Sequence, residues 1–281
     1  MANEYKIAVL LPTRGRTAAL SRSVESLVNL AKDTDSIQIM LGFDNDDPVG
    51  IEHFSSVLQP WLDERDLHYT AMTFDPMGYI RLNEYVNALA TQSSADWLVF
   101  WNDDAVMETQ DWDQEIVSYT GQFKILAFRT HNDHPYSIFP IVPRAWLDVL
   151  GHLSPHQISD GWISQNAYCI DVMQRIPVHV KHDRADLTGN NLDQTYKNRP
   201  MLEGNPSDPR DFHYIDWVVK RMKECDTLSE YMKDQGLDTS WWENIKENKQ
   251  DPWEKLRIND VNDQMRQFAI SVSPSGQVVK L

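Results

Sequence analysis

Residues 97–101 are apolar or aromatic throughout, and they run directly into Asn102, Asp103 and Asp104. An unbroken apolar run that ends in polar residues is typical of a strand buried on both faces, as in a parallel sheet. Ligands bind at the carboxyl ends of such strands. The adjacent carboxylates repel each other unless a cation offsets their charge, and hard divalent ions prefer oxygen ligands. A solvated turn rich in Asp and Asn is the alternative interpretation.

The preceding residues alternate between apolar runs and helical periodicity. Residues 7–11 lead into the loop Pro12-Thr13-Arg14-Gly15-Arg16, and the second run ends at Asp44. Alternating strands and helices indicate an α/β fold, with a mostly parallel sheet between helices. The expected strands are 7–11, 37–43, 69–74 and 97–101, and the expected helices are 17–31, 50–62 and 79–90.

Three of these strands deliver polar clusters at their carboxyl ends, which lie on one edge of a parallel sheet. The clusters are Thr13 with Arg14, then Asp44, and then the group that begins at Asn102. A surface that was merely rich in turns would not place all of its clusters on one edge. The convergence predicts a nucleotide site.

The second part of the chain is less regular. Strands are expected at 125–128, 138–142 and 176–180, and a helix at 144–150. Residues 200–211 contain three Pro and one Gly, a composition typical of a linker, and apolar positions beyond them indicate helices. We therefore expect a domain over 1–199, with halves 1–110 and 111–199, and a helical extension over 200–281.

Composition limits the partners that the chain can have. The net charge of −16 works against a polyanion, so DNA would need a local basic groove from Arg129, Arg144, Lys181 and Arg184. No apolar run approaches the roughly 18 residues of a transmembrane helix, and the first residues do not form a secretory signal. Two cysteines give neither metal-site spacing nor disulfide density. A cytoplasmic location is the resulting expectation.

The loop from Pro12 to Arg16, Asp44 after the second strand, and the cluster Asn102 to Asp104 resemble the GT-A glycosyltransferases, closest to the family 2 type. The resemblance is good over residues 6–110, weaker over 110–195 and absent beyond about 200. It implies a GT-A fold, a nucleotide-sugar donor and a divalent metal, Mn²⁺ or Mg²⁺. The order and spacing of the three elements carry the resemblance.

The resemblance assigns roles around the nucleotide. It implies that Asp44 accepts a hydrogen bond from the base, commonly uracil in this family. Arg81 and Asn83 resemble the Arg-Asn pair that precedes the metal strand, although Leu82 replaces the usual Arg. The residues implied to line the nucleotide pocket are Pro12, Thr13, Arg14, Asp44, Arg81, Asn83, Asn102 and Asp103.

The resemblance also implies a metal site. Asp104 would bind the ion that bridges the diphosphate, and Asn102, at the first position of the family's Asp-x-Asp motif, would approach the ribose. A carboxamide is a weaker metal ligand than a carboxylate, so Asp103 is a possible helper. His182 would be a further ligand. On an alternating strand it shares a face with apolar residues 176, 178 and 180, and so points inward.

Asp160 lies where family 2 enzymes place the catalytic base. It would deprotonate an acceptor hydroxyl during in-line attack on the anomeric carbon, which inverts the configuration. A retaining outcome stays open, and the alternative interpretation is an Asp that caps a helix over 162–170.

The leading hypothesis is a metal-dependent glycosyltransferase that moves a sugar, preferably from a UDP-sugar, to a hydroxyl acceptor. A glycan or small molecule is favoured as acceptor over hydroxymethylated DNA. Two alternatives are a nucleotidyltransferase, whose usual Gly-rich loop with Lys is missing here, and an inactive glycosyltransferase-like binding module. The acceptor and the oligomeric state do not follow from the sequence.

Overall fold

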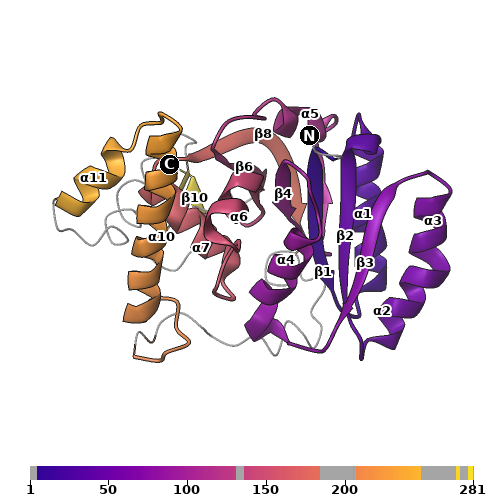
Figure 1. Cartoon of the computed structure of the whole chain (residues 1–281). Helices are drawn as coiled ribbons and strands as arrows, with labels where there is room; N and C mark the ends of the chain where they lie inside the picture. The colour runs from indigo at the N-terminus through magenta and orange to yellow at the C-terminus, as the bar shows by residue number, and fades with distance from the viewer. Residues whose placement is uncertain are drawn as a thin grey trace.

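The computed structural model places an eight-stranded sheet at the centre, with helices on both faces (Figure 1). It describes residues 5–130, 136–183, 205 and 207–247, and the backbone of 270–272 and 278–280. The strand order is β3-β2-β1-β4-β7-β6-β8-β5, and four of the seven neighbouring pairs are parallel, which confirms the α/β prediction. The strands are β1 (Ile7–Thr13), β2 (Ile37–Asp44), β3 (His68–Phe74), β4 (Trp97–Phe100), β5 (Ala105–Met107), β6 (Ile125–Thr130), β7 (Pro140–Pro143) and β8 (Met173–His182).

The first four strands form the parallel half of the sheet. Every residue of β2 and β4 is buried, as expected of apolar runs between two layers of helices. The pairings of β1 with β2 and of β2 with β3 each run over seven residues without a register shift. All four strands lie within two residues of their predicted bounds. Their carboxyl ends meet at one edge, as predicted.

The second half of the sheet mixes directions. Strand β7 runs antiparallel to β4 and β6, and β6 runs parallel to β8 with a register shift between Ala127 and Arg129. The predicted strands in this half correspond to β6, β7 and β8. Strand β5 was not predicted, since it has only three residues. It pairs antiparallel with β8 and sets Ala105 opposite His182.

Each face of the sheet has its own apolar core. Leu20, Val24 and Leu27 recur at helical spacing on α1 and are buried against one face, where each contributes about 1.5–3 kcal/mol. Helices α4, α6, α7 and α10 pack on the other face. The helices are α1 (Thr17–Leu30), α2 (Pro48–His53), α3 (Gln59–Asp63), α4 (Leu82–Thr91), α5 (Trp112–Val117), α6 (Arg144–Leu150), α7 (Ser159–Cys169), α10 (Ile215–Asp234) and α11 (Ser240–Glu247), with the short turns η1 (Thr34–Ser36), η2 (Phe54–Leu58) and η3 (Tyr79–Arg81).

The C-terminal helices lie at the outer side of this second face (Figure 1). Helix α10 packs on α6 and α7, and its Cys225, Leu228 and Met232 join the core there. A short antiparallel pair, β9 (Ile270–Val272) with β10 (Val278–Lys280), was not predicted. Most of 184–206 and all of 248–269 lie outside the described residues, so the division at 199 stays a prediction. Within the described part, no helix combines the length and apolar character needed to cross a bilayer.

Candidate functional site

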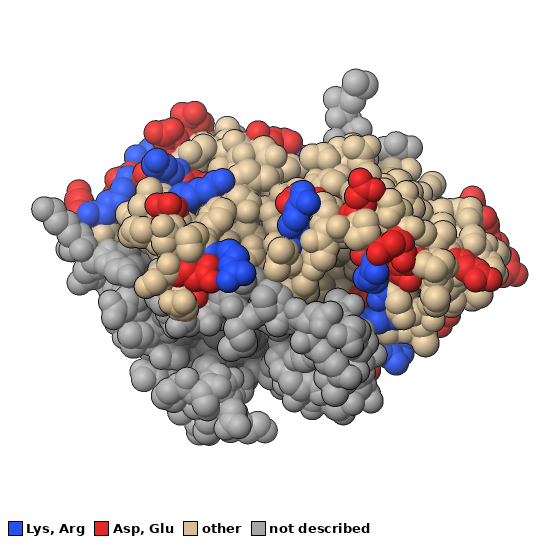
Figure 2. All heavy atoms as spheres, turned by 90° about the horizontal axis from the view of Figure 1, so that it is seen from below, with Lys and Arg blue, Asp and Glu red and all other residues tan. Residues whose placement is uncertain are grey.

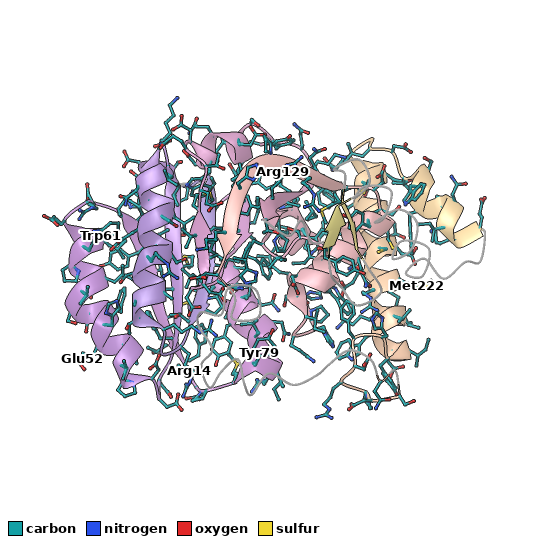
Figure 3. All side chains as sticks on the ribbon, turned by 180° about the vertical axis from the view of Figure 1, so that it is seen from behind. Arg14, Glu52, Trp61, Tyr79, Arg129 and Met222 are labelled. Carbon is teal, nitrogen blue, oxygen red and sulfur yellow. The ribbon has the colours of Figure 1, made fainter. Side chains whose placement is uncertain are left out.

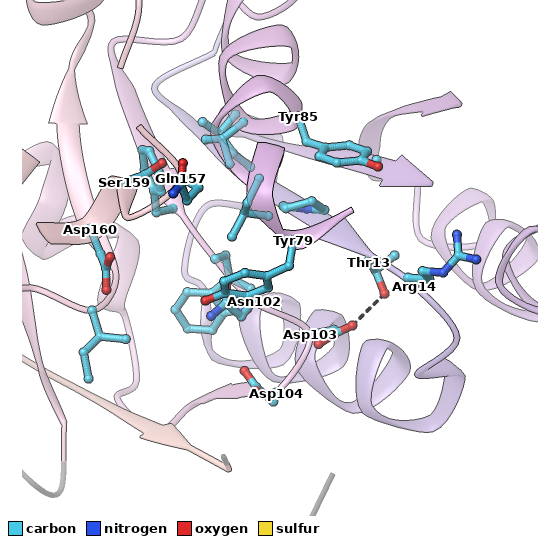
Figure 4. A pocket seen from close by; sticks show the side chains of 18 of the residues that line it. Thr13, Arg14, Tyr79, Tyr85, Asn102, Asp103, Asp104, Gln157, Ser159 and Asp160 are labelled. Carbon is cyan, nitrogen blue, oxygen red and sulfur yellow. Dashed lines mark hydrogen bonds between the residues drawn. The ribbon is translucent and has the colours of Figure 1, made fainter. Parts of the chain in front are cut away.

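A cavity of about 330 Å³ opens at the carboxyl ends of β1, β2 and β4. The start of α4 and the start of α7 complete its walls. Figure 4 shows Thr13 and Arg14 on one side of it, and Ser159 and Asp160 on the other. The predicted site residues among its lining are Pro12, Thr13, Arg14, Asp44, Asn102, Asp103, Asp104, Asp160 and His182.

Asp44 is held at the end of β2 by two partners. Arg14 Nη1 donates to its Oδ2 at 2.6 Å, and the Tyr85 hydroxyl donates to its Oδ1. Arg14 also pairs with Asp46, and both carboxylates raise the pKa of its guanidinium. Burial and the bond to Asp44 raise the pKa of Tyr85 to about 12, so its hydroxyl keeps its proton. Since each carboxylate oxygen has two lone pairs, Asp44 can still accept a hydrogen bond from a ligand.

Asp103 is a buried carboxylate with both oxygens engaged. Thr13 Oγ1 donates to its Oδ2 at 2.8 Å, the bond drawn in Figure 4, and Arg16 Nη1 donates to its Oδ1 at 3.0 Å. Burial raises the pKa of Asp103 to about 6, with Asp104 acting in the same direction and Arg16 and Thr13 acting against it.

Asp104 is placed differently from its neighbour. The pairing of β5 with β8 brings His182 Nε2 to 3.4 Å from its Oδ1, and Arg16 Nη1 lies 3.5 Å from its Oδ2. Its Oδ1 is buried and accepts no hydrogen bond within the part of the chain that the structure describes. Burying such an atom without a partner costs free energy, so this oxygen is suited to a ligand.

A carboxylate and an imidazole together fit a divalent ion such as Mn²⁺ or Mg²⁺. The described residues contain no cluster of three or more His, Cys, Asp or Glu side chains that could hold a metal by themselves. An ion on Asp104 and His182 would therefore take its other ligands from a bound diphosphate and water.

Asp160 lies in the first turn of α7 and not at its cap. The helix begins at Ser159, three residues earlier than predicted, and Ile158 occupies the capping position, so the capping interpretation of Asp160 is wrong. Its Oδ1 accepts a hydrogen bond of 2.9 Å from the Gly161 backbone N–H. A Cβ on Gly161 would lie 2.9 Å from Ile158 Cγ2 and 3.4 Å from a ring atom of Phe212, so this glycine allows close packing.

Arg81 and Asn83 do not line the cavity. Arg81 pairs with Glu84 on the exposed surface, and Asn83 Nδ2 faces the Ser154 carbonyl at 3.5 Å. The reason is helical geometry: Leu82, Tyr85 and Val86, at spacings of three and four, occupy the face of α4 turned to the cavity. The assignment of Arg81 and Asn83 to the nucleotide site thus rests on the resemblance alone.

The side chains in the wall to which the sequence reasoning assigns no role include Arg16, Tyr79 and Tyr85. Tyr79 belongs to η3, just before α4, and is labelled among the lining side chains in Figure 4. Tyr85 could have been identified from its spacing of three from Leu82, which places both side chains on one face of a helix. For Arg16 the only signal was a second guanidinium in a loop that leads to the site.

One described member of the basic groove considered for a nucleic acid, Arg144, is held by the backbone. Arg144 donates to three backbone carbonyls, those of Ala95, Ala90 and Ser93, at 3.0, 3.3 and 2.9 Å. Arg129, labelled in Figure 3, is the next-to-last residue of β6 and pairs with His179 of β8. Figure 2 shows blue and red side chains interspersed over the described part of the lower face. Arg184 lies outside the described residues.

No protein-family model and no curated protein matches the sequence. Solved structures match the fold. The mannosyltransferase PcManGT from Pyrobaculum calidifontis, in complex with GDP-Man and Mn²⁺, has a TM-score of 0.54 and 10% identity over 94% of this chain and 85% of its own. TarS from S. aureus, residues 1–349 in complex with UDP-GlcNAc, has a TM-score of 0.54 and 11% identity over 78% of this chain and 66% of its own.

A third structure, GalNAc-T7 with UDP, GalNAc and Mn²⁺, has a TM-score of 0.57 and 11% identity over 93% of this chain and 58% of its own. These three structures define the class: the chain has the GT-A fold of nucleotide-sugar glycosyltransferases. The fold implied by the sequence resemblance is therefore confirmed. At such low identity the similarity does not carry a substrate or a residue's role to this chain.

Proposed function

We propose that the protein is a glycosyltransferase that moves a sugar from a nucleoside-diphosphate donor to a hydroxyl acceptor. One observation carries the proposal: a single cavity holds Asp44, the Asn102–Asp104 cluster and Asp160 on the fold described above. Three groups of side chains suited to a base, a diphosphate and an acceptor hydroxyl thus share one space. The nucleotide-sugar complexes of the structural neighbours support the donor class.

The donor's base and ribose are assigned to the β1–β2 side. Asp44 accepts the N3–H of a uracil, while Arg14, already bonded to Asp44, donates to a ring carbonyl oxygen. Asn102 hydrogen-bonds a ribose hydroxyl. A hydrogen-bond acceptor (Asp44) beside a hydrogen-bond donor (Arg14) is complementary to the N3–H and carbonyl oxygens of uracil. UDP-sugars are therefore the favoured sugar donors.

The diphosphate is assigned to the ends of β4 and β8. Asp104 and His182 would hold Mn²⁺ or Mg²⁺, as their separation of 3.4 Å allows. When bound, such an ion offsets the negative charge of the leaving diphosphate. Asp103, the neighbour of Asp104, is held by hydrogen bonds from Thr13 and Arg16.

Asp160 is assigned the role of general base. It lies across the cavity from the β1 loop, in the first turn of α7 (Figure 4). It takes the proton of the acceptor hydroxyl as the oxygen attacks the anomeric carbon and the nucleoside diphosphate departs. Attack from the face opposite the leaving group inverts the configuration. The acceptor is proposed to be a glycan or a small molecule, because the net charge of −16 works against a polyanion such as DNA.

The first experiment measures the melting temperature with MnCl₂ and each of UDP, GDP, TDP and CDP. A ligand of the native state raises the melting temperature by mass action, so we expect a rise that needs both the metal and one nucleotide. No rise with any pair would contradict a metal-and-diphosphate site. The nucleotide that binds then selects the sugar donors for a turnover assay, in which nucleoside diphosphate release is measured with an acceptor panel.

Asp160→Asn tests the base. We expect turnover to fall by roughly 10²–10⁴-fold, the usual contribution of a positioned proton acceptor, while the nucleotide-induced rise in melting temperature stays unchanged. Asp66→Asn is the matched control, because Asp66 is exposed and has φ +53°, which Asn tolerates. Wild-type turnover in Asp160→Asn would exclude this base. Release of pyrophosphate from a nucleoside triphosphate and a sugar phosphate would instead favour a nucleotidyltransferase.

A further inference from the structure

Arg16 reaches the carboxylate pair from the loop between β1 and α1. Its Nη1 lies 3.0 Å from Asp103 Oδ1 and 3.5 Å from Asp104 Oδ2. Its side chain is 16% exposed, whereas that of Arg14 is 40% exposed. A guanidinium thus fills the space beside the carboxylate at which a divalent ion is expected.

The loop holds this arginine in place. Gly15 adopts φ +68°, and its N–H donates to Asp47 Oδ2 at 2.7 Å. The other oxygen of Asp47 accepts from Gly50 N–H at 3.1 Å, so the loop is fastened to the start of α2. The Arg16 carbonyl accepts the first hydrogen bond of α1, from Leu20 N–H at 2.9 Å. The position of Arg16 is therefore set by the fold on both sides.

The guanidinium changes what the site offers a cation. It occupies one lone pair of Asp103 Oδ1, while Thr13 occupies one of Asp103 Oδ2, so of these two carboxylates Asp104 is the one with an oxygen that accepts no hydrogen bond in the described structure. It also leaves the two carboxylates with one net negative charge instead of two. Both effects weaken the attraction for a divalent ion. A diphosphate reverses them, because phosphate oxygens are strong guanidinium acceptors and themselves supply metal ligands.

We infer that Arg16 makes divalent-cation binding depend on the nucleoside diphosphate: it holds the cation affinity low in the nucleotide-free protein and turns to the phosphates when they enter. The inference rests on the proposed function in taking a nucleoside diphosphate and a divalent ion at Asp104 as the ligands. It assigns Arg16 a positioning role toward the metal and the donor.

The test is binding of MnCl₂, UDP and GDP to the full chain, measured by calorimetry and by the electron paramagnetic resonance signal of free Mn²⁺. In the wild-type protein, we expect UDP or GDP to tighten Mn²⁺ binding by at least about tenfold. In Arg16→Gln, we expect Mn²⁺ alone to bind on the order of tenfold more tightly, and the nucleotide alone to bind several-fold more weakly. All measurements are made in one buffer at one pH, so that wild type and variants are compared directly.

Arg65→Gln is the matched control, since it removes one positive charge from a half-exposed side chain that pairs with Glu64 away from the cavity. It should leave both affinities unchanged. In Arg16→Gln the Mn²⁺ affinity is expected to rise and the nucleotide affinity to fall. Misfolding would instead lower both affinities. Two results would overturn the inference. One is Mn²⁺ affinity that is unchanged or weaker in folded Arg16→Gln, and the other is wild-type Mn²⁺ affinity that does not respond to UDP or GDP. Neither readout involves sugar transfer, so the proposed activity can fail while this inference stands.

Discussion

The two sides of the cavity are built in different ways. On the donor side, the site residues follow directly from fully buried parallel strands whose register is uninterrupted. On the acceptor side, Asp160 lies on a helix that is positioned by contacts with residues much further along the chain: Gly161 packs against Phe212, and Trp162 Nε1 donates at 2.7 Å to Glu224, 62 residues away. Strand ends place the donor groups, whereas tertiary packing places the acceptor group.

If this contrast is correct, changing the end of β4 should affect ligand binding and leave stability unchanged. Asp104→Asn removes a charged metal ligand, so we expect Mn²⁺ affinity in the presence of UDP or GDP to fall by more than about 100-fold. The melting temperature without ligand should stay at the wild-type value or rise, because repulsion from Asp103 is removed. Calorimetry and thermal unfolding measure the two effects, and Asp66→Asn again serves as control. Retained Mn²⁺ affinity would contradict the metal assignment.

On the acceptor side, the same contrast predicts effects on stability. Burial raises the pKa of Glu224 from its ordinary 4.5 to about 7, against the opposing bonds from Trp162 and Asn166. The folded state therefore holds the proton more tightly than the unfolded state, so this group stabilises the fold below about pH 4.5 and its contribution is lost as the pH rises to 7.

Glu224→Gln keeps an oxygen for both donors and cannot ionise. We expect the variant to gain about 2 kcal/mol of unfolding free energy relative to the wild type between pH 4.5 and 7. Urea unfolding at several pH values measures this difference, and Glu230→Gln, on the exposed surface of α10, is the control. A difference that does not vary with pH would show that Glu224 does not titrate in this range.

The smallest expected effect concerns the close packing at the start of α7. Gly161→Ala introduces a Cβ within 2.9 Å of Ile158 Cγ2, and overpacking of this kind costs about 1–2 kcal/mol. Thermal unfolding measures the loss, and Gly236→Ala, which meets no atom within 4 Å but has φ +72°, shows the cost of backbone strain alone. Wild-type stability in Gly161→Ala would mean that α7 can shift, which would weaken the contrast between the two sides.

The strands of the donor side could be predicted because their signal is local. Long apolar runs mark β1, β2 and β4, and the polar clusters sit directly after them in the sequence. The convergence of Thr13, Asp44 and Asn102 followed from parallel geometry alone. Strand β5 was missed because three residues give no periodicity.

The acceptor side could be predicted less well, for a physical reason. Helix α7 is buried on almost all sides, so it has no polar stripe to mark its start, and the prediction placed the start three residues late. The direction of Arg16 depends on the positive φ of Gly15 and on the bond to Asp47, neither of which a sequence pattern encodes. Which side chains of α4 face the cavity depends on where the helix begins. The prediction began it at residue 79, whereas α4 begins at Leu82, so the sequence did not identify Leu82 and Tyr85 as the cavity-facing residues.

The bond between Trp162 and Glu224 has a consequence for the order in which the molecule is made. A chain emerging from the ribosome exposes its first four strands and their helices early. The start of helix α7 depends on residues made later, because the indole N–H of Trp162 donates to Glu224, which is 62 residues further along the chain. In a nascent chain that ends before α10, the helix that carries Asp160 therefore still lacks this contact.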